Sequence, residues 1–118
     1  MDNLHKEFHE NGKVKEKFLI KNGLKHGQFE EYDEKGKLEQ IGNYDNGLKQ
    51  GNCKNYLHFG LTENVFYENG VLNGPFELFH KNGQLCRKGF YKDDKSFGKQ
   101  EEYFKNGQLK SKGYWCPD

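Results

Sequence analysis

Histidine has the widest chemical range of the side chains in this sequence, because it binds metals and transfers protons near neutral pH. The sequence has five histidines, at positions 5, 9, 26, 58 and 80. None of them forms an HxxxH or HExxH pattern, and His9 and His80 hold one position of an internal repeat, three units apart. On a sheet that separation is roughly 30 Å. We therefore interpret the histidines as solvated strand residues and predict no metal site.

Cysteine and serine offer no better basis for catalysis. Cys53, Cys86 and Cys116 form no CxxC pair, and neither Ser96 nor Ser111 lies in a G-x-S-x-G segment. No cysteine has an identifiable histidine partner, and an odd number of cysteines without the spacing of a secreted framework predicts reduced thiols. We interpret Cys53 as a small core residue that replaces phenylalanine. We expect no enzyme activity and no cofactor.

Carboxylates are the ionisable groups that recur most regularly. Glu30, Glu77 and Glu101 hold one repeat position, with Glu31 and Glu102 beside them. Successive members lie one or two units apart, which is too far for a catalytic pair of carboxylates. Two interpretations stay open: solvated charge, or an acidic stripe that meets a basic groove on a partner.

A repeat of about 24 residues positions all these groups. Glycine recurs at positions 12, 36, 60, 83 and 107, and a second series follows at 27, 51, 74 and 98. The corresponding units are residues 8–27, 28–51, 52–74, 75–98 and 99–118, of which the first and last are partial. We therefore treat residues 1–118 as one repeat domain.

Each unit contains two predicted strands. In the second unit an aromatic run that begins at Phe29 precedes a turn at Gly36, and a second run from Leu38 precedes a turn at Gly47. Six Asn-Gly pairs favour type I′ hairpin turns, whose two central residues both need positive φ. We predict an all-β fold, an elongated single-layer twisted antiparallel sheet of about five β-hairpin repeats, roughly 50 Å long.

Composition limits the remaining function classes. Lysine and arginine number 19 against 18 acidic residues, a formal net charge of +1, which argues against a general nucleic-acid binder. No apolar leader precedes the first unit and no run is long enough to span a membrane, so we predict a cytoplasmic protein.

Trp115 and Pro117 predict a cap on the last strand. The sheet edges are either blunted by charge or paired in a homodimer, and the sequence leaves both open.

The pattern FxxYxxNGxLxxxGxYxxGxxxG runs through most of the chain, from Phe8 to Tyr114. In the second unit it is carried by Phe29, Tyr32, Gly36, Leu38, Gly42, Tyr44, Gly47 and Gly51. This pattern resembles the variant MORN repeat of bacterial proteins, many of which are described as antitoxins of toxin–antitoxin systems. The resemblance implies a hairpin-repeat fold and a binding use, because repeat modules are scaffolds whose function lies in surface positions.

Departures from this pattern predict a contact surface. The third unit has Phe59-Gly60 in place of Asn-Gly, and Leu57, Phe59 and Leu61 put apolar side chains at a hairpin tip that is polar in other units. The fourth unit replaces an Asn-Gly turn with an acidic pair that is followed by Lys95, Ser96 and Phe97. The complete set of candidate partner-binding residues is Leu57, Phe59, Leu61, Glu30, Glu77, Asp93, Asp94, Phe97, Glu101 and Glu102.

We expect a non-enzymatic inhibitor, antitoxin-like or immunity-like, that sequesters a toxin or nuclease by direct protein–protein contact. In this hypothesis Leu57, Phe59 and Leu61 anchor the partner, and the acidic residues oppose a basic active site. A phage-encoded anti-defence inhibitor of a host nuclease would use the same contacts. A phospholipid-associated MORN scaffold is a second alternative, which the mixture of lysine with acidic residues disfavours. Nucleic-acid binding through exposed aromatics ranks lower still, because the net charge is near zero.

Overall fold

The computed structural model describes residues 3–115, and these form one open antiparallel sheet without an α-helix. The strands are β1 (Asn3–Phe8), β2 (Val14–Lys21), β3 (Leu24–Tyr32), β4 (Leu38–Asp45), β5 (Leu48–Lys49), β6 (Gly51–Tyr56), β7 (Thr62–Glu68), β8 (Val71–Leu72), β9 (Gly74–Phe79), β10 (Leu85–Lys92), β11 (Lys95–Tyr103) and β12 (Leu109–Trp115). A short 3-10 turn, η1 (His58–Gly60), joins β6 to β7. The prediction of an all-β hairpin array is confirmed.

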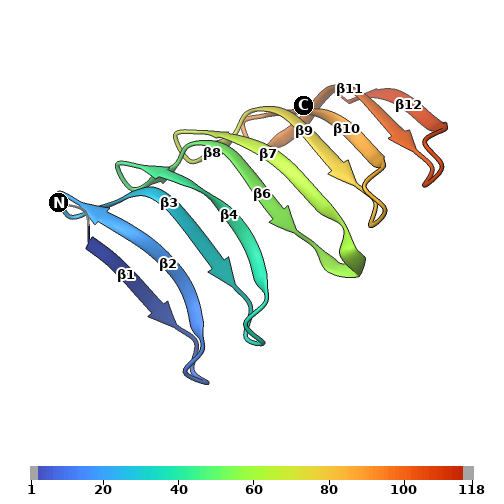
Figure 1. Cartoon of the computed structure of the whole chain (residues 1–118). Helices are drawn as coiled ribbons and strands as arrows, with labels where there is room; N and C mark the ends of the chain where they lie inside the picture. The colour runs from blue at the N-terminus through green and yellow to red at the C-terminus, as the bar shows by residue number, and fades with distance from the viewer. Residues whose placement is uncertain (1–2, 116–118) are drawn as a thin grey trace.

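The sheet is long, thin and curved along its strands (Figure 1), with extents of 47 × 30 × 23 Å. Its strands follow the order β1-β2-β3-β4-β6-β7-β9-β10-β11-β12, while β5 pairs with β4 and β8 with β7. One long rim, the lower rim, consists of the loops 9–13, 33–37, 57–61, 80–84 and 104–108. The upper rim consists of the turns at 22–23, 46–47, 69–70 and 93–94.

The two rims use different turns. In the upper turns the asparagines at positions 22, 46 and 69 have φ of 52°, 50° and 51° and precede glycines that also have positive φ, as type I′ turns require. In the lower loop 9–13 only Gly12 has positive φ, and the Asn11 side chain accepts a hydrogen bond from the Lys13 amide at 2.9 Å. The prediction of type I′ turns at all Asn-Gly pairs is therefore wrong for the lower rim, where a longer loop needs a single left-handed residue.

Four of the lower hairpins carry a β-bulge directly after the loop. In the register of each hairpin, one residue has no partner on the opposite strand; these residues are Lys15, Glu39, Cys86 and Lys110. A bulge bends its strand and redirects a side chain. In the third hairpin, by contrast, β6 pairs with β7 residue for residue. The third unit therefore departs from the others in backbone register as well as in sequence.

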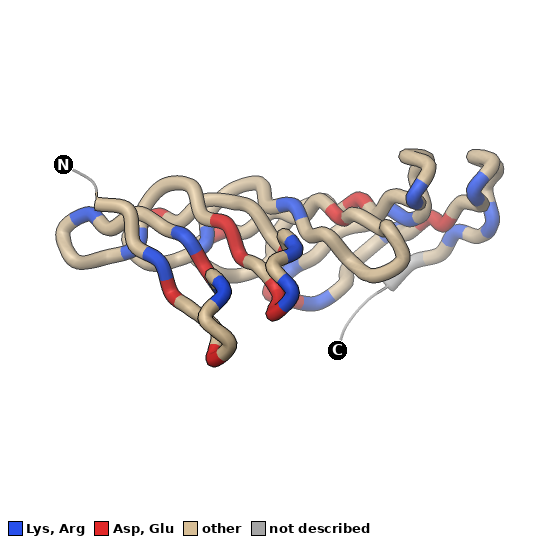
Figure 2. The backbone as a smooth tube through the Cα atoms, turned by 60° about the horizontal axis from the view of Figure 1, so that its bottom comes forward, with Lys and Arg blue, Asp and Glu red and all other residues tan. Residues whose placement is uncertain are grey.

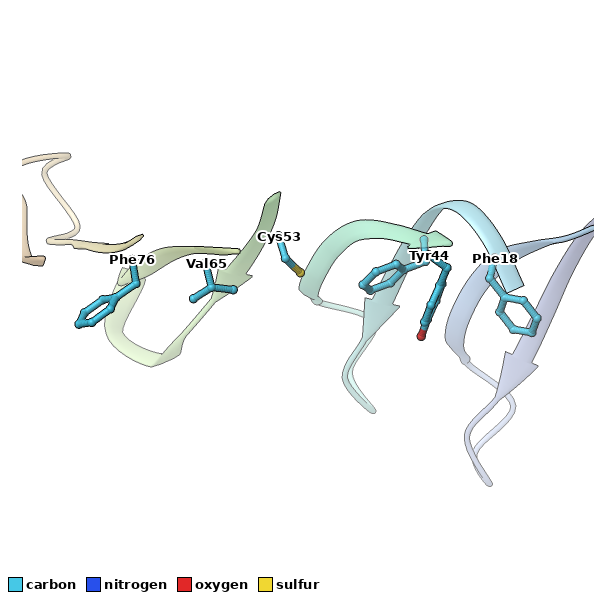
Figure 3. Packing of buried hydrophobic residues seen from close by; sticks show 6 residues of the cluster. Phe18, Tyr44, Cys53, Val65 and Phe76 are labelled. Atoms are coloured by element: carbon cyan, nitrogen blue, oxygen red, sulfur yellow. The ribbon is translucent and has the colours of Figure 1, made fainter. Parts of the chain in front are cut away.

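The buried side chains lie on the inner side of the curve (Figure 3), which we call the inner face. Six of them form one cluster, each from a different strand: Phe18, Phe29, Tyr44, Cys53, Val65 and Phe76. The ring centroids of Phe29 and Tyr44 are 4.5 Å apart. Stacking between neighbouring hairpins thus replaces a closed core, and the interpretation of Cys53 as a core residue is confirmed.

Two sequence predictions concern the membrane and the C-terminal end. Across residues 3–115 no helix is long and apolar enough to cross a membrane. The predicted cap at Trp115 and Pro117 depends on side chains outside the described residues.

Candidate functional site

The hairpin tip at residues 57–61 carries the most exposed large apolar side chain among residues 3–113, the part of the chain whose side chains are described. Phe59 is 92% exposed, and the next, Leu4, is 61% exposed. The Leu57 amide donates to the Leu61 carbonyl at 2.8 Å, and the Leu61 amide donates to the His58 carbonyl at 3.3 Å. These bonds close the loop beneath the Phe59 ring. The structure therefore brings together the three apolar residues that the sequence singles out, with Leu57 exposed and Leu61 half-buried.

The backbone of this tip is unusual. Phe59 has φ 62° and ψ 25°, in the left-handed region, and Gly60 follows with φ 77°. Within the described residues the other non-glycine positions with positive φ are Asn22, Asn46, Asn69, Asp93 and Asp94. Asparagine and aspartate tolerate this conformation, whereas an aromatic residue in it is an outlier. A backbone outlier at an exposed position is a reason to look for function there.

Side chains from neighbouring loops hold the lower rim together. His9 Nε2 lies 2.9 Å from the Tyr32 carbonyl oxygen, and His80 Nε2 lies 2.9 Å from the Tyr103 carbonyl oxygen. Both histidines are half-buried. The interpretation of His9 and His80 as solvated residues is therefore wrong, because each connects its own loop to the next one.

The three glutamates that share a repeat position lie on the outer face of the sheet. Glu30 directly follows the core residue Phe29, and successive strand residues point to opposite faces. The cross-strand register forms one row of Lys6, Lys17, Glu30, Ile41, Lys54, Asn64, Glu77, Lys88, Glu101 and Lys112. Lys99 also lies 3.1 Å from Glu101. The acidic stripe is interleaved with lysine and lies apart from the tip.

The remaining candidates also lie apart from the tip. Asp93 and Asp94 form a regular upper turn, with φ of 52° and 69°. Asp94 Oδ1 accepts a hydrogen bond from the Leu72 amide at 2.7 Å, so this pair connects two neighbouring turns. Phe97 is opposite Phe90 on the outer face, and the two are 41% and 49% exposed. On the inner face the candidate Glu102 is opposite Arg87.

The repeat geometry agrees with the comparison to known families. The model of the MORN repeat variant matches residues 1–22, 25–46, 72–93 and 98–116. The chain belongs to the MORN repeat variant family. No curated protein matches it. The segment between the second and third matched stretches contains the hairpin without a bulge and the Phe59 tip. The MORN repeats therefore suggest a binding scaffold, and the third unit is where this chain departs from the family pattern.

The inner face of this MORN sheet carries a polar row that the sequence interpretation missed. The register aligns Glu7, Glu16, Glu31, Gln40, Asn55 and Glu63 across neighbouring strands. Glu16 is buried and accepts hydrogen bonds from Lys25 Nζ at 2.7 Å and from the Tyr44 hydroxyl at 2.8 Å. The signal was available, because Glu31 is two positions from Phe29 and must share its face. In the described part of the chain, no group of three or more His, Cys, Asp or Glu residues could hold a metal ion.

The pKa of Glu31 predicts how this row responds to pH. Burial raises the pKa of the Glu31 carboxyl, Lys49 at 3.6 Å lowers it, and Glu16 raises it, so that it stays above the usual 4.5. Ionised Glu31 therefore costs stability at pH 7, and this cost disappears as the pH falls below 4.5, where the carboxyl is protonated in the folded and unfolded states. We expect Glu31→Gln to raise Tm at pH 7 but not below pH 4.5.

Thermal unfolding followed by circular dichroism at both pH values measures this difference. Glu34→Gln in an exposed loop is the matched control, and its Tm should follow the parent at each pH. A lower Tm of Glu31→Gln at pH 7 would show that the pairing with Lys49 outweighs burial.

The two described cysteines should differ in reactivity. Burial raises the pKa of the Cys53 thiol to about 11, whereas Cys86 is only half-buried. Because the thiolate is the reactive form, we expect iodoacetamide to modify Cys86 in the folded protein and Cys53 only after denaturation. Peptide mass spectrometry over a time course measures both rates. Equal rates in the folded protein would contradict the packing of Cys53.

Proposed function

We propose that this MORN chain is a non-enzymatic protein-binding module whose loop 57–61 inserts Phe59 into a pocket on another protein. Binding there blocks the partner in the manner of an antitoxin, and the family resemblance makes a toxin or nuclease the expected partner. The observation that carries the proposal is the 92% exposure of Phe59 on a loop that main-chain hydrogen bonds close.

The physical support for this proposal is preorganisation. A loop that already has its bound shape loses little conformational freedom on binding. An aromatic side chain that enters a desolvated pocket is a typical hot spot of a protein interface. Leu57, which is exposed beside Phe59, adds apolar area at the edge of the contact.

Phe59→Asn is the variant that tests the anchor. Asparagine accepts the left-handed backbone, so the loop keeps its shape while the aromatic ring is lost. Phe8→Asn is the matched control, because Phe8 is 59% exposed on β1. Tagged parent protein recovers the partner from cells, and the purified partner is then titrated by calorimetry. We expect Phe59→Asn to bind about 30-fold more weakly and Phe8→Asn to bind like the parent.

Inhibition is measured on the same purified partner. One equivalent of the parent chain should abolish the partner's activity, and Phe59→Asn should restore it at the same concentration. A partner that binds the parent and Phe59→Asn equally would place the contact elsewhere on the sheet. A partner that is bound but stays fully active would contradict the inhibitory role.

A further inference from the structure

The lower rim divides into two parts of different charge. The acidic residues of its loops all lie in the first two loops, where Glu10, Asp33 and Glu34 accompany Lys13, Lys35 and Lys37. The loops 57–61, 80–84 and 104–108 contain no aspartate or glutamate, and the last two contain Lys81 and Lys105. We call these three loops, with the bulge residue Lys110, the basic rim. Figure 2 shows the positions of the charged residues along the array.

Lys81 lies directly beside the Phe59 tip. A Cβ atom at Gly60 would be 2.7 Å from Lys81 Cγ and 2.9 Å from its Cδ. The aliphatic part of Lys81 therefore packs against the backbone of loop 57–61. Because Lys81 is exposed, its charged end remains in solvent near the anchor.

The positive surface continues from Lys81 to the last loop. Asn82 Nδ2 donates to the Lys105 carbonyl at 3.0 Å, which joins loop 80–84 to loop 104–108. Lys110 Nζ lies 5.9 Å from the ring centroid of Phe104, which is 49% exposed. Phe59 and Phe104 are two hairpins apart, so the basic rim is about 20 Å long.

A hollow between the last two hairpins shows the same change of charge. It measures about 520 Å³ and is lined by Lys105 and Lys110, with Glu102 also in its wall. The corresponding hollow between the first two hairpins measures about 210 Å³ and is lined by Glu16, Glu31 and Glu39, with Lys15 also in its wall. Lys110 and Glu39 are both bulge residues of their hairpins. The two hollows therefore carry opposite charge at this one equivalent position, Glu39 in the first and Lys110 in the last.

We infer that the basic rim binds an acidic protein surface, so that the partner's pocket for Phe59 is surrounded by carboxylates. This inference rests on the proposed function, whose site it specifies. The basis of this inference is charge complementarity. The acidic stripe predicts a basic surface on the partner, whereas the basic rim predicts an acidic one. A protein fits better than a single-stranded nucleic acid, because Leu57 and Leu61 flank Phe59 and aliphatic side chains do not stack on bases as aromatic ones do.

Charge reversal on the rim separates this inference from the proposed function. Lys81→Glu with Lys105→Glu reverses the basic rim, and Lys35→Glu with Lys37→Glu is the matched control in loop 33–37. All four side chains are exposed, and a second variant, Lys81→Gln with Lys105→Gln, removes the charge without reversing it and guards against a folding defect. With the partner that the parent recovers, we expect the rim variant to bind at least about tenfold more weakly at low salt, and the control to bind like the parent.

A defined probe tests the chemistry directly. It is a synthetic amidated peptide in which one tryptophan and two leucines are flanked by a pair of glutamates on each side. In an NMR titration of the full chain, we expect shifts at the amides of the loops 57–61, 80–84 and 104–108. The same peptide with lysines in place of the glutamates should shift these amides only in the rim variant.

Three results would overturn the inference. The first is a glutamate peptide that shifts no rim amide, or that binds parent and rim variant equally. The second is an oligothymidylate of about twelve nucleotides that binds the rim more tightly than the peptide and is lost in the rim variant, which would make the ligand a nucleic acid. The third is a partner that Phe59→Asn releases but the rim variant retains. This last result would support Phe59 as the anchor and contradict only the inference of an acidic partner surface.

Discussion

Phe29→Ala is expected to lower the free energy of unfolding by about 3–5 kcal/mol, the cost of removing a buried phenylalanine and leaving a cavity. Phe29 is 1% exposed and is the most buried member of the core cluster. Its ring packs against Tyr44 and beneath the Lys49 ammonium, 5.3 Å from the ring centroid. Because each hairpin contacts only its neighbours, the loss at β3 should separate the array into a short and a long part that are weakly coupled.

Urea denaturation followed by circular dichroism measures this effect. Phe8→Ala is the control, since Phe8 is 59% exposed and its truncation should cost less than about 1 kcal/mol. We also expect a broader transition for Phe29→Ala, because loss of coupling between repeats lowers cooperativity. Equal midpoints for the two variants would mean that the stacked rings are not the principal source of stability.

Gly42→Ala is expected to destabilise the protein by about 1–3 kcal/mol through overpacking. Gly42 is directly opposite Phe29, whose ring covers it. An added Cβ would lie 2.8 Å from Cys53 Sγ and 3.0 Å from Phe29 Cε1, and both side chains are buried. Neither side chain can move without disturbing the core, so the glycine at this repeat position makes room for the neighbouring ring.

Gly113→Ala provides the matched control for Gly42→Ala. Gly113 holds the same repeat position in the last unit, and a Cβ there would meet nothing within 4 Å. Alanine should be neutral or slightly stabilising at this site, because it reduces the freedom of the unfolded chain. Urea midpoints of the two variants measure the difference. A similar loss of stability in both would indicate that the glycine serves backbone conformation instead of packing.

Much of the fold and part of the site could be predicted from the sequence, because hairpins are local. The spacing of the glycines places every lower loop and three of the four upper turns, and the order of the strands in the sheet follows their order in the chain. The replacement of Asn-Gly by Phe59-Gly60 is likewise local, so the sequence alone identifies the tip. The face shared by the core aromatics follows from strand parity.

The tertiary structure decided which neighbours these residues have, because bulges and curvature set the cross-strand register. The repeat period alone grouped Glu30, Glu77 and Glu101 into an acidic stripe, yet the register places lysines between them. It also showed His9 and His80 as connections between loops. A net charge of +1 does not reveal that the charge is unevenly distributed along the lower rim. In a single-layer array, cross-strand contacts join residues from different units, and only the folded register brings Lys81 against the Phe59 loop.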